Sequence, residues 1–293
     1  MTLYFSDREN GPPARTHEEI DEAVWGGLYV LMSRHLADGS LGHRFPDVCP
    51  DGYGICGHDD KMLRLAVAAE LRGMTWPLSP EELPPTIVIL DLLEFIASAV
   101  GTPMKGFYHS FFRHHHLTFD HEDGRIRFAA DVNSIFQRNG IAYELTDDGH
   151  IRRLLPAGLA EILSPTIFRT GDVETDRLLE AARRQILKPH KEVRQDALEK
   201  LWDAFERLKT LEPGKDKRSR ADELLDKATR LPTRFRTLLA DEAGALTDMG
   251  NNYRIRHSET TQEPLTDPAQ IDYFFARMFA FVRYVLKQTG RGG

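Results

Sequence analysis

Apolar residues recur at helical spacing through the first hundred residues of the chain. Thr16 and Glu19 have the form of a capping box, which predicts that a helix begins there. An aspartate at 59–60 predicts the start of a second helix, and Gly73 its end. Residues 87–100 are strongly apolar and predict a third helix.

The middle of the chain predicts strands. Residues 110–128 follow no single period, and the Glu-Asp-Gly sequence at 122–124 favours a short hairpin within them. Residues 141–145 and 150–154 alternate between apolar and polar positions on either side of an Asp-Gly turn at 148–149. This second pattern is a good hairpin signal.

The last 120 residues or so predict only helices. The clearest covers residues 193–211, where Trp202 lies on a continuous apolar stripe. Pro268 suits the first turn of a last helix over residues 271–287. The remaining expected elements are helices over 174–187, 221–228 and 233–248, with a basic linker at 215–220.

Charge is distributed unevenly between the two parts. Residues 175–293 carry 23 Lys and Arg against 19 Asp and Glu, a balance of +4, so the total of −7 leaves −11 for residues 1–174. The basic part could face a phosphate backbone, although mixed charge commonly just solvates helix faces. We therefore predict a mainly α protein with two domains: an α+β domain over 1–170 containing a small β-hairpin, and an all-α bundle over 171–293.

The composition limits the class of protein. Apolar content of 41% and charged content of 28% are ordinary for a globular chain. No apolar run reaches the ~20 residues that a membrane helix needs, and the first residues do not form a secretory signal. Two cysteines cannot make a disulfide framework. We expect a cytoplasmic protein without a membrane partner.

Cys49, Cys56 and His58 lie together in a Gly-rich segment. Thiolate and imidazole are ligands that zinc prefers, but a structural site needs four. A fourth ligand could come from His35, His43, Asp59 or Asp60. The spacing matches no standard zinc finger. We therefore interpret these residues as ordinary loop positions and expect no metal and no cofactor.

Three consecutive histidines, His114, His115 and His116, follow two phenylalanines. Adjacent residues of a strand point to opposite faces, so all three cannot bind one ion without distortion. We interpret them as a solvated strand or loop end.

The chain lacks the Walker lysine loop, the GxGxxG turn and the GxSxG elbow. Asp91 and Glu94 form a carboxylate pair one helical turn apart, which the polar edge of an amphipathic helix explains. Hydride transfer, phosphoryl transfer from ATP and serine hydrolysis are therefore disfavoured.

Residues 250–259 differ in kind, because they bring two Arg, one His, two Asn and one Glu into ten positions between helices. Histidine can move protons near neutral pH and arginine stabilises charge on phosphate. Such a set suits cleavage of RNA by its own 2′-hydroxyl without a metal. The structural alternative is a loop in which Arg254 and Arg256 pair with an acidic helix such as the one carrying Glu206.

Several segments resemble AbiJ-type abortive-infection proteins of bacteria. In the N-terminal part they are Tyr4-Phe-Ser-Asp-Arg-Glu-Asn-Gly11 with the helix through Trp25, and Asn139-Gly-Ile-Ala-Tyr-Glu-Leu145. In the C-terminal part, residues 197–209 and Ile255-Arg-His-Ser-Glu259 look like a HEPN domain. Together these segments cover most of the chain.

The resemblance implies a helical HEPN bundle, commonly dimeric, that in many members is a metal-independent RNase of antiviral defence. His257 matches the motif histidine, whereas no arginine stands at 250–252, where the motif arginine belongs. Arg256 or Arg254 would have to replace it. The catalytic residues we predict are His257, Arg256, Arg254, Asn252 and Glu206, with Asn251, Glu259 and Lys209 as binding residues.

Two hypotheses follow. The first is a homodimeric endoribonuclease acting in antiviral defence, with His257 as proton shuttle and RNA as substrate. The second is a bundle that cleaves nothing, and instead dimerises or binds a phage component, nucleic acid or a partner protein. The absent motif arginine favours the second hypothesis, and the survival of Arg, His and Glu together favours the first.

Overall fold

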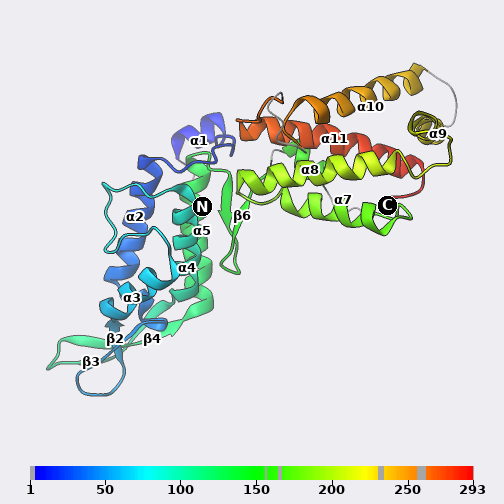
Figure 1. The fold of residues 1–293 in the computed structure, drawn as a ribbon. Coiled ribbons are helices and arrows are strands. Elements are labelled where there is room, and N and C mark those ends of the chain that lie inside the picture. Colours follow the sequence, from blue (N-terminus) through cyan, green and yellow to red (C-terminus); the bar gives the residue numbers. More distant parts are fainter. Residues whose placement is uncertain (1–3, 156, 164–166, 230–233, 256–261, 293) are drawn as a thin grey trace. The chain divides into compact units, whose positions relative to one another are not determined.

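The computed structural model describes residues 4–155, 157–163, 167–229, 234–255 and 262–292. The chain folds as two compact units, Met1–Leu154 and Leu155–Gly293. The first unit combines helices with small antiparallel sheets, and the described part of the second is built on helices (Figure 1). The predicted mainly α fold with an α+β N-terminal region is therefore confirmed.

Helices form the core of the first unit. Trp25 and Phe128 are among its largest fully buried side chains, and the core also draws on the apolar faces of α3 and α4. The helices are α1 (Phe5–Asn10), α2 (Glu22–Ala37), the 3₁₀ turn η1 (Ser40–His43), α3 (Asp60–Glu70), α4 (Thr86–Ala99) and α5 (His121–Arg138).

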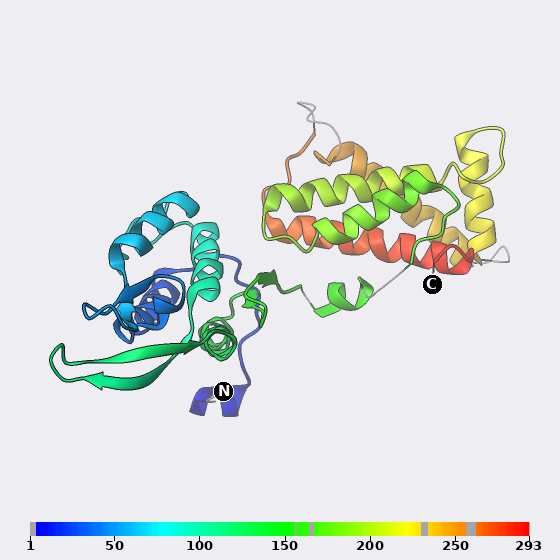
Figure 2. The same cartoon turned by 90° about the horizontal axis from the view of Figure 1, so that it is seen from below.

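A four-stranded antiparallel sheet lies at one end of this unit, in the order β1-β2-β4-β3. Strands β3 and β4 form a long hairpin that Figure 2 shows clearly. The hairpin predicted around Asp148-Gly149 is confirmed as strands β5 and β6. The strands are β1 (Pro46–Val48), β2 (Ile55–His58), β3 (Thr102–His109), β4 (His114–Asp120), β5 (Tyr143–Leu145) and β6 (Ile151–Arg153).

The helix predicted to start at Thr16 begins later. Asp21 is its cap, because the carboxylate accepts a hydrogen bond of 2.9 Å from the N–H of Val24. The residues before it run extended, and His17 exchanges backbone hydrogen bonds with Gly140 and Ala142. The capping box predicted from Thr16 and Glu19 was therefore wrong, because this segment pairs with residues 140–142 and does not begin the helix.

The hairpin expected at residues 122–124 was also wrong. Asp120 caps α5, and its carboxylate accepts a 3.0 Å hydrogen bond from the N–H of Asp123. A side chain at Gly124 would place its Cβ 2.5 Å from the N atom of Thr102. The glycine therefore allows the first turn of the helix to approach β3, and the acidic residues suit the positive helix start.

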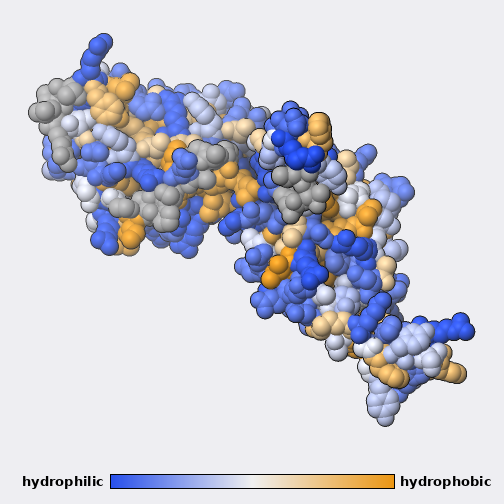
Figure 3. All heavy atoms as spheres, turned by 180° about the vertical axis from the view of Figure 1, so that it is seen from behind, coloured by the Kyte–Doolittle hydropathy of each residue, from blue (hydrophilic) through white to orange (hydrophobic). Residues whose placement is uncertain are grey.

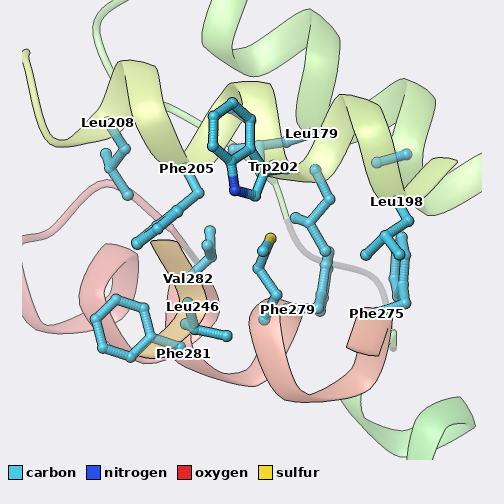
Figure 4. Packing of buried hydrophobic residues seen from close by; sticks show 14 of the residues in the cluster. Leu179, Leu198, Trp202, Phe205, Leu208, Leu246, Phe275, Phe279, Phe281 and Val282 are labelled. Atoms are coloured by element: carbon cyan, nitrogen blue, oxygen red, sulfur yellow. The ribbon is translucent and has the colours of Figure 1, made fainter. Parts of the chain in front are cut away.

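Helices of the second unit pack around one apolar core. Helix α8 lies beside α7 and α11, and the side chains of α8 and α11 interdigitate in Figure 4. Buried aromatic residues dominate this contact, including Trp202, Phe205, Phe275 and Phe279. The helices are α6 (Ala157–Ile162), α7 (Val173–Gln185), α8 (Lys191–Leu208), α9 (Lys217–Thr229), α10 (Arg234–Asn252) and α11 (Pro268–Gln288).

Most helices predicted for this unit are confirmed, with Pro268 in the first turn of α11 behind an Asp267 cap. Helix α10 continues through Asn252, so the residues predicted to begin a polar loop at 250–252 are helical. Across the described ranges, no helix has both the length and the apolar composition needed to cross a bilayer.

Candidate functional site

The polar segment predicted from sequence leaves the end of α10. Its described ends are joined, because the N–H of Arg254 donates to the carbonyl of Glu263 at 2.9 Å. The N–H of Glu263 donates in return to the carbonyl of Asn252, also at 2.9 Å. We call residues 252–254 and 262–263, which these hydrogen bonds join, the base of the segment. Residues 256–261 lie between its two sides in the sequence.

Side chains fix this base to the bundle. Gln262 donates from Nε2 to the carbonyl of Asn251 at 3.1 Å, and Gln195 of α8 donates to the carbonyl of Arg254 at 2.7 Å. Ile255 is buried in the core, and the ring of Tyr253 lies edge-on to Phe274 with centroids 4.9 Å apart. The base is therefore held by both polar and apolar contacts.

Two described residues of the predicted catalytic set, Arg254 and Asn252, donate hydrogen bonds to nearby backbone carbonyls. Arg254 donates from Nε to the carbonyl of Gln262 at 3.1 Å, and Asn252 donates from Nδ2 to the carbonyl of Asp248 at 2.8 Å. Both side chains thus stabilise the base or the helix end. Arg256, His257 and Glu259 lie outside the described residues.

Glu206 and Lys209 lie at the C-terminal end of α8, whereas Gln195, which contacts the base, lies near its start. Lys209 pairs with the carboxylate of Glu206 and donates to the hydroxyl of Thr247 at 3.0 Å. Its ammonium also lies 4.5 Å from the ring centroid of Phe205. Glu206 follows Gln195 by three helical turns, about 16 Å along the axis. The structure therefore does not bring Glu206 to the base that holds Arg254.

A protein-family model described as AbiJ N-terminal domain 4 matches residues 3–161, more than half of the chain. The chain belongs to this family. The membership confirms the AbiJ-type resemblance seen in the N-terminal sequence and assigns the protein to an abortive-infection defence family. No curated protein and no solved structure showed a significant match to the chain.

In the N-terminal unit, Cys49, Cys56 and His58, which sequence spacing grouped, have different partners. Cys56 donates from its thiol to Asp47, 3.5 Å from the carboxylate, and His58 lies 3.0 Å from a carboxylate oxygen of Asp60. Burial, and next the nearby Asp47 charge, raise the pKa of the Cys56 thiol to about 11. Cys49 lies instead against His114, with Sγ and Nε2 3.0 Å apart.

Sequence reasoning missed this neighbourhood. Cys49 and His114 are 65 positions apart, and their elements meet because β2 pairs with both β1 and β4. The available signal was the alternation of a strand, which puts His114 and His116 on one face and His115 on the other. Taking the three consecutive histidines as one group hides the pair formed by His114 and His116.

Proposed function

We propose that this AbiJ-family protein acts in abortive-infection defence by cleaving RNA, through residues 250–259 of its helical unit. His257 would take the proton from the ribose 2′-hydroxyl as this oxygen bonds to phosphorus, and Arg256 would stabilise the charged phosphorane. His257 would then return the proton to the 5′-oxygen as the P–O5′ bond breaks, which leaves a 2′,3′-cyclic phosphate. Neither step requires a metal or a cofactor. Glu206 has no part in this proposal, because it lies three turns from the base of the segment.

The observation that supports the proposal is the hydrogen-bonded base formed by residues 252–254 and 262–263. Two backbone hydrogen bonds join Asn252, Arg254 and Glu263, and Gln195 ties the same point to α8. A catalytic group contributes most when its support is fixed before the substrate binds. A polar segment on such a base suits a site better than a long unanchored linker would.

The HEPN-type reading also implies a homodimer with two copies of the segment brought together at a two-fold interface. Light scattering at tens of micromolar, on the order of concentrations where weak dimers form, should therefore give the dimer mass. A monomer under those conditions would count against a shared site.

The direct test incubates the purified full-length protein with mixed RNA in EDTA. Wild-type protein should produce fragments, and His257→Ala should reduce the cleavage rate by at least about 100-fold. His190→Ala is the matched control, because His190 is an exposed histidine of the same unit whose side chain does not cap α8. Equal cleavage by wild type and His257→Ala would mean a contaminating nuclease.

Thermal melts separate a catalytic from a structural role. Because His257 and Arg256 are polar residues of a polar segment, truncating either one should lower the free energy of unfolding by about 1 kcal/mol or less. Inactivity with an unchanged melting temperature supports catalysis. A large drop in both variants would assign the segment a structural role.

The second candidate is a module that binds RNA or a partner protein and cleaves neither. The observations that favour it are the absence of an arginine at 250–252 and the use of Arg254 Nε on the carbonyl of Gln262. In this case RNA would be retained in a gel-shift experiment or a partner recovered, and no fragments would form in the cleavage assay.

A further inference from the structure

A cluster of metal-ligating side chains lies between the loop after β1 and the tip of the β3–β4 hairpin. The ligand atoms of Cys49, His114 and His116 all lie within 4.8 Å of one another. His109 adds a third imidazole: the ring centroids of His109, His114 and His116 are 5.9 to 6.0 Å apart in every pairing. We propose that Cys49, His109, His114 and His116 bind one zinc ion.

Three of the four side chains face the carboxylate of Asp51. The Oδ2 atom of Asp51 lies 3.1 Å from Nε2 of His109 and 3.4 Å from Nε2 of His116. The same carboxylate interacts with the thiol of Cys49. Three ligands of the proposed site thus face one carboxylate, whose negative charge would compensate the charge of the ion.

One nitrogen atom of this cluster has no hydrogen-bond partner among the described residues. Nε2 of His116 is buried and has no hydrogen-bond partner there, although Asp51 lies within ion-pair distance. Buried polar atoms normally have a partner. A zinc ion bound to Nε2 would provide one.

The backbone holds the ligands in place before any ion binds. His109 pairs directly with His114 across the hairpin, and the turn between them contains Arg113 at a φ of 57°. A positive φ is unusual for arginine and is kept where surrounding contacts require it. The N–H of Arg113 donates to the carbonyl of His109 at 2.8 Å, which closes the turn.

The loop that carries Cys49, on the other side of the cluster, is also held by backbone contacts. The N–H of Cys49 donates to the carbonyl of Gly54 at 3.0 Å, so residues 49–54 form a closed loop. Gly54 has a φ of 81°, and a Cβ there would lie 2.9 Å from Cγ of His116. This glycine allows the loop to approach the imidazole, and it places Cys49 beside the histidines.

The ligand set favours zinc over other cations. One thiolate with imidazoles suits zinc, whereas magnesium and calcium prefer oxygen ligands. Cys49 is only 2% exposed, and four protein ligands would leave no position for a substrate. The site is therefore structural, and it ties the β1–β2 loop to the β3–β4 hairpin.

The ion would fix a surface rich in aromatic residues. Phe107, Tyr108, Phe111 and Phe112 at the hairpin tip are exposed. Figure 3 shows hydrophobic residues among polar ones at this end of the first unit, at the lower right. A short hairpin has little core of its own, so a metal is an effective way to hold its tip in one conformation.

Elemental analysis of the full-length protein, purified without chelator, tests the proposal. About one zinc per chain is expected. Cys49→Ser and His114→Ala should each lose it. The matched controls are Cys56→Ser, which removes the other cysteine, and His115→Ala. His115 faces away from the cluster, with Nδ1 3.1 Å from the carbonyl of Gly106. Zinc loss in the controls as well, or no zinc in the wild type, would overturn the proposal.

A spectroscopic measurement covers the case in which a ligand variant does not fold. Wild-type protein stripped of metal and titrated with Co²⁺ should show the visible bands of a tetrahedral site and a thiolate-to-cobalt charge-transfer band. Asp51→Asn should weaken Co²⁺ affinity by about 10- to 100-fold while keeping both bands, because it removes a negative charge beside the ion but no ligand. A cobalt spectrum without the thiolate band, or no cobalt binding, would contradict the assignment.

Discussion

The indole of Trp202 on α8 occupies the space that a side chain at position 250 would need. A Cβ built at Gly250 would lie 1.6 Å from Nε1 of Trp202. Gly250 is helical, so its role is close approach between α10 and α8 and not a turn. This contact lies at the first residue of the segment 250–259 proposed as the catalytic site, and it sets the distance between the two helices there.

Gly250→Ala should therefore destabilise the second unit by about 1–3 kcal/mol through overpacking, measured by urea unfolding. Gly244→Ala is the matched control on the same helix, because nothing lies within 4 Å of a Cβ at Gly244. That change should be neutral or stabilise by up to about 1 kcal/mol, since alanine favours the helix. Equal effects of the two substitutions would show that α8 and α10 are not in close contact.

Truncating the core should unfold this unit. Trp202 and Phe279 are 6% and 1% exposed, and each replacement by alanine should cost roughly 3–5 kcal/mol. Tyr273→Ala on the same helix as Phe279 should cost less than about 1 kcal/mol, because Tyr273 is 60% exposed. A comparable loss for Tyr273→Ala would indicate that its face of α11 is covered in solution.

A buried ion pair joins α8 to α11. Nη1 of Arg194, which is 1% exposed, lies 3.4 Å from each carboxylate oxygen of Asp272. Asp272→Ala should cost about 3–5 kcal/mol, because it leaves a buried guanidinium without its carboxylate. Combining it with Arg194→Met should cost clearly less than the sum of the single changes in a double-mutant cycle. Additive losses would mean that the two residues are not coupled.

Acid should weaken the start of α7. Hydrogen bonds from Arg207, and next from the N–H of Thr175, lower the pKa of Asp172 to about 2. A carboxyl whose pKa is lowered by folding stabilises the protein above its unfolded pKa, and this contribution disappears as the pH falls from about 4 to about 2. Asp172→Asn keeps a good helix cap but removes the charge.

The melting temperature of Asp172→Asn should therefore depend less on pH than that of the wild type within this window. Above about pH 5 the melting temperatures of the two proteins should change with pH in parallel, because the wild-type carboxyl is ionised in both the folded and the unfolded state. If the melting temperatures of the two proteins had the same slope between about pH 4 and pH 2, Asp172 would not contribute to the loss of stability in acid.

Local sequence was sufficient where an element depends on its own residues. The apolar stripe through Trp202 predicted α8, and the Asp-Gly turn at 148–149 predicted the hairpin of β5 and β6. The AbiJ-type resemblance of the N-terminal residues was likewise present in the sequence. Periodicity and turn chemistry act over a few positions, so they can be recognised without knowing the fold.

Tertiary structure decided the features that join distant parts of the chain. Gly124 is typical of a turn in sequence, but it lies in the first turn of α5, where β3 passes 2.5 Å from the position that its Cβ would take. Cys49 was grouped with Cys56 by proximity along the chain, whereas strand pairing places it beside His114. The sequence places Glu206 in the catalytic set, whereas in the structure it pairs with Lys209, which in turn donates to Thr247 of α10. Side chains far apart in sequence meet only through the packing of whole elements, and a short sequence pattern carries no information about that packing.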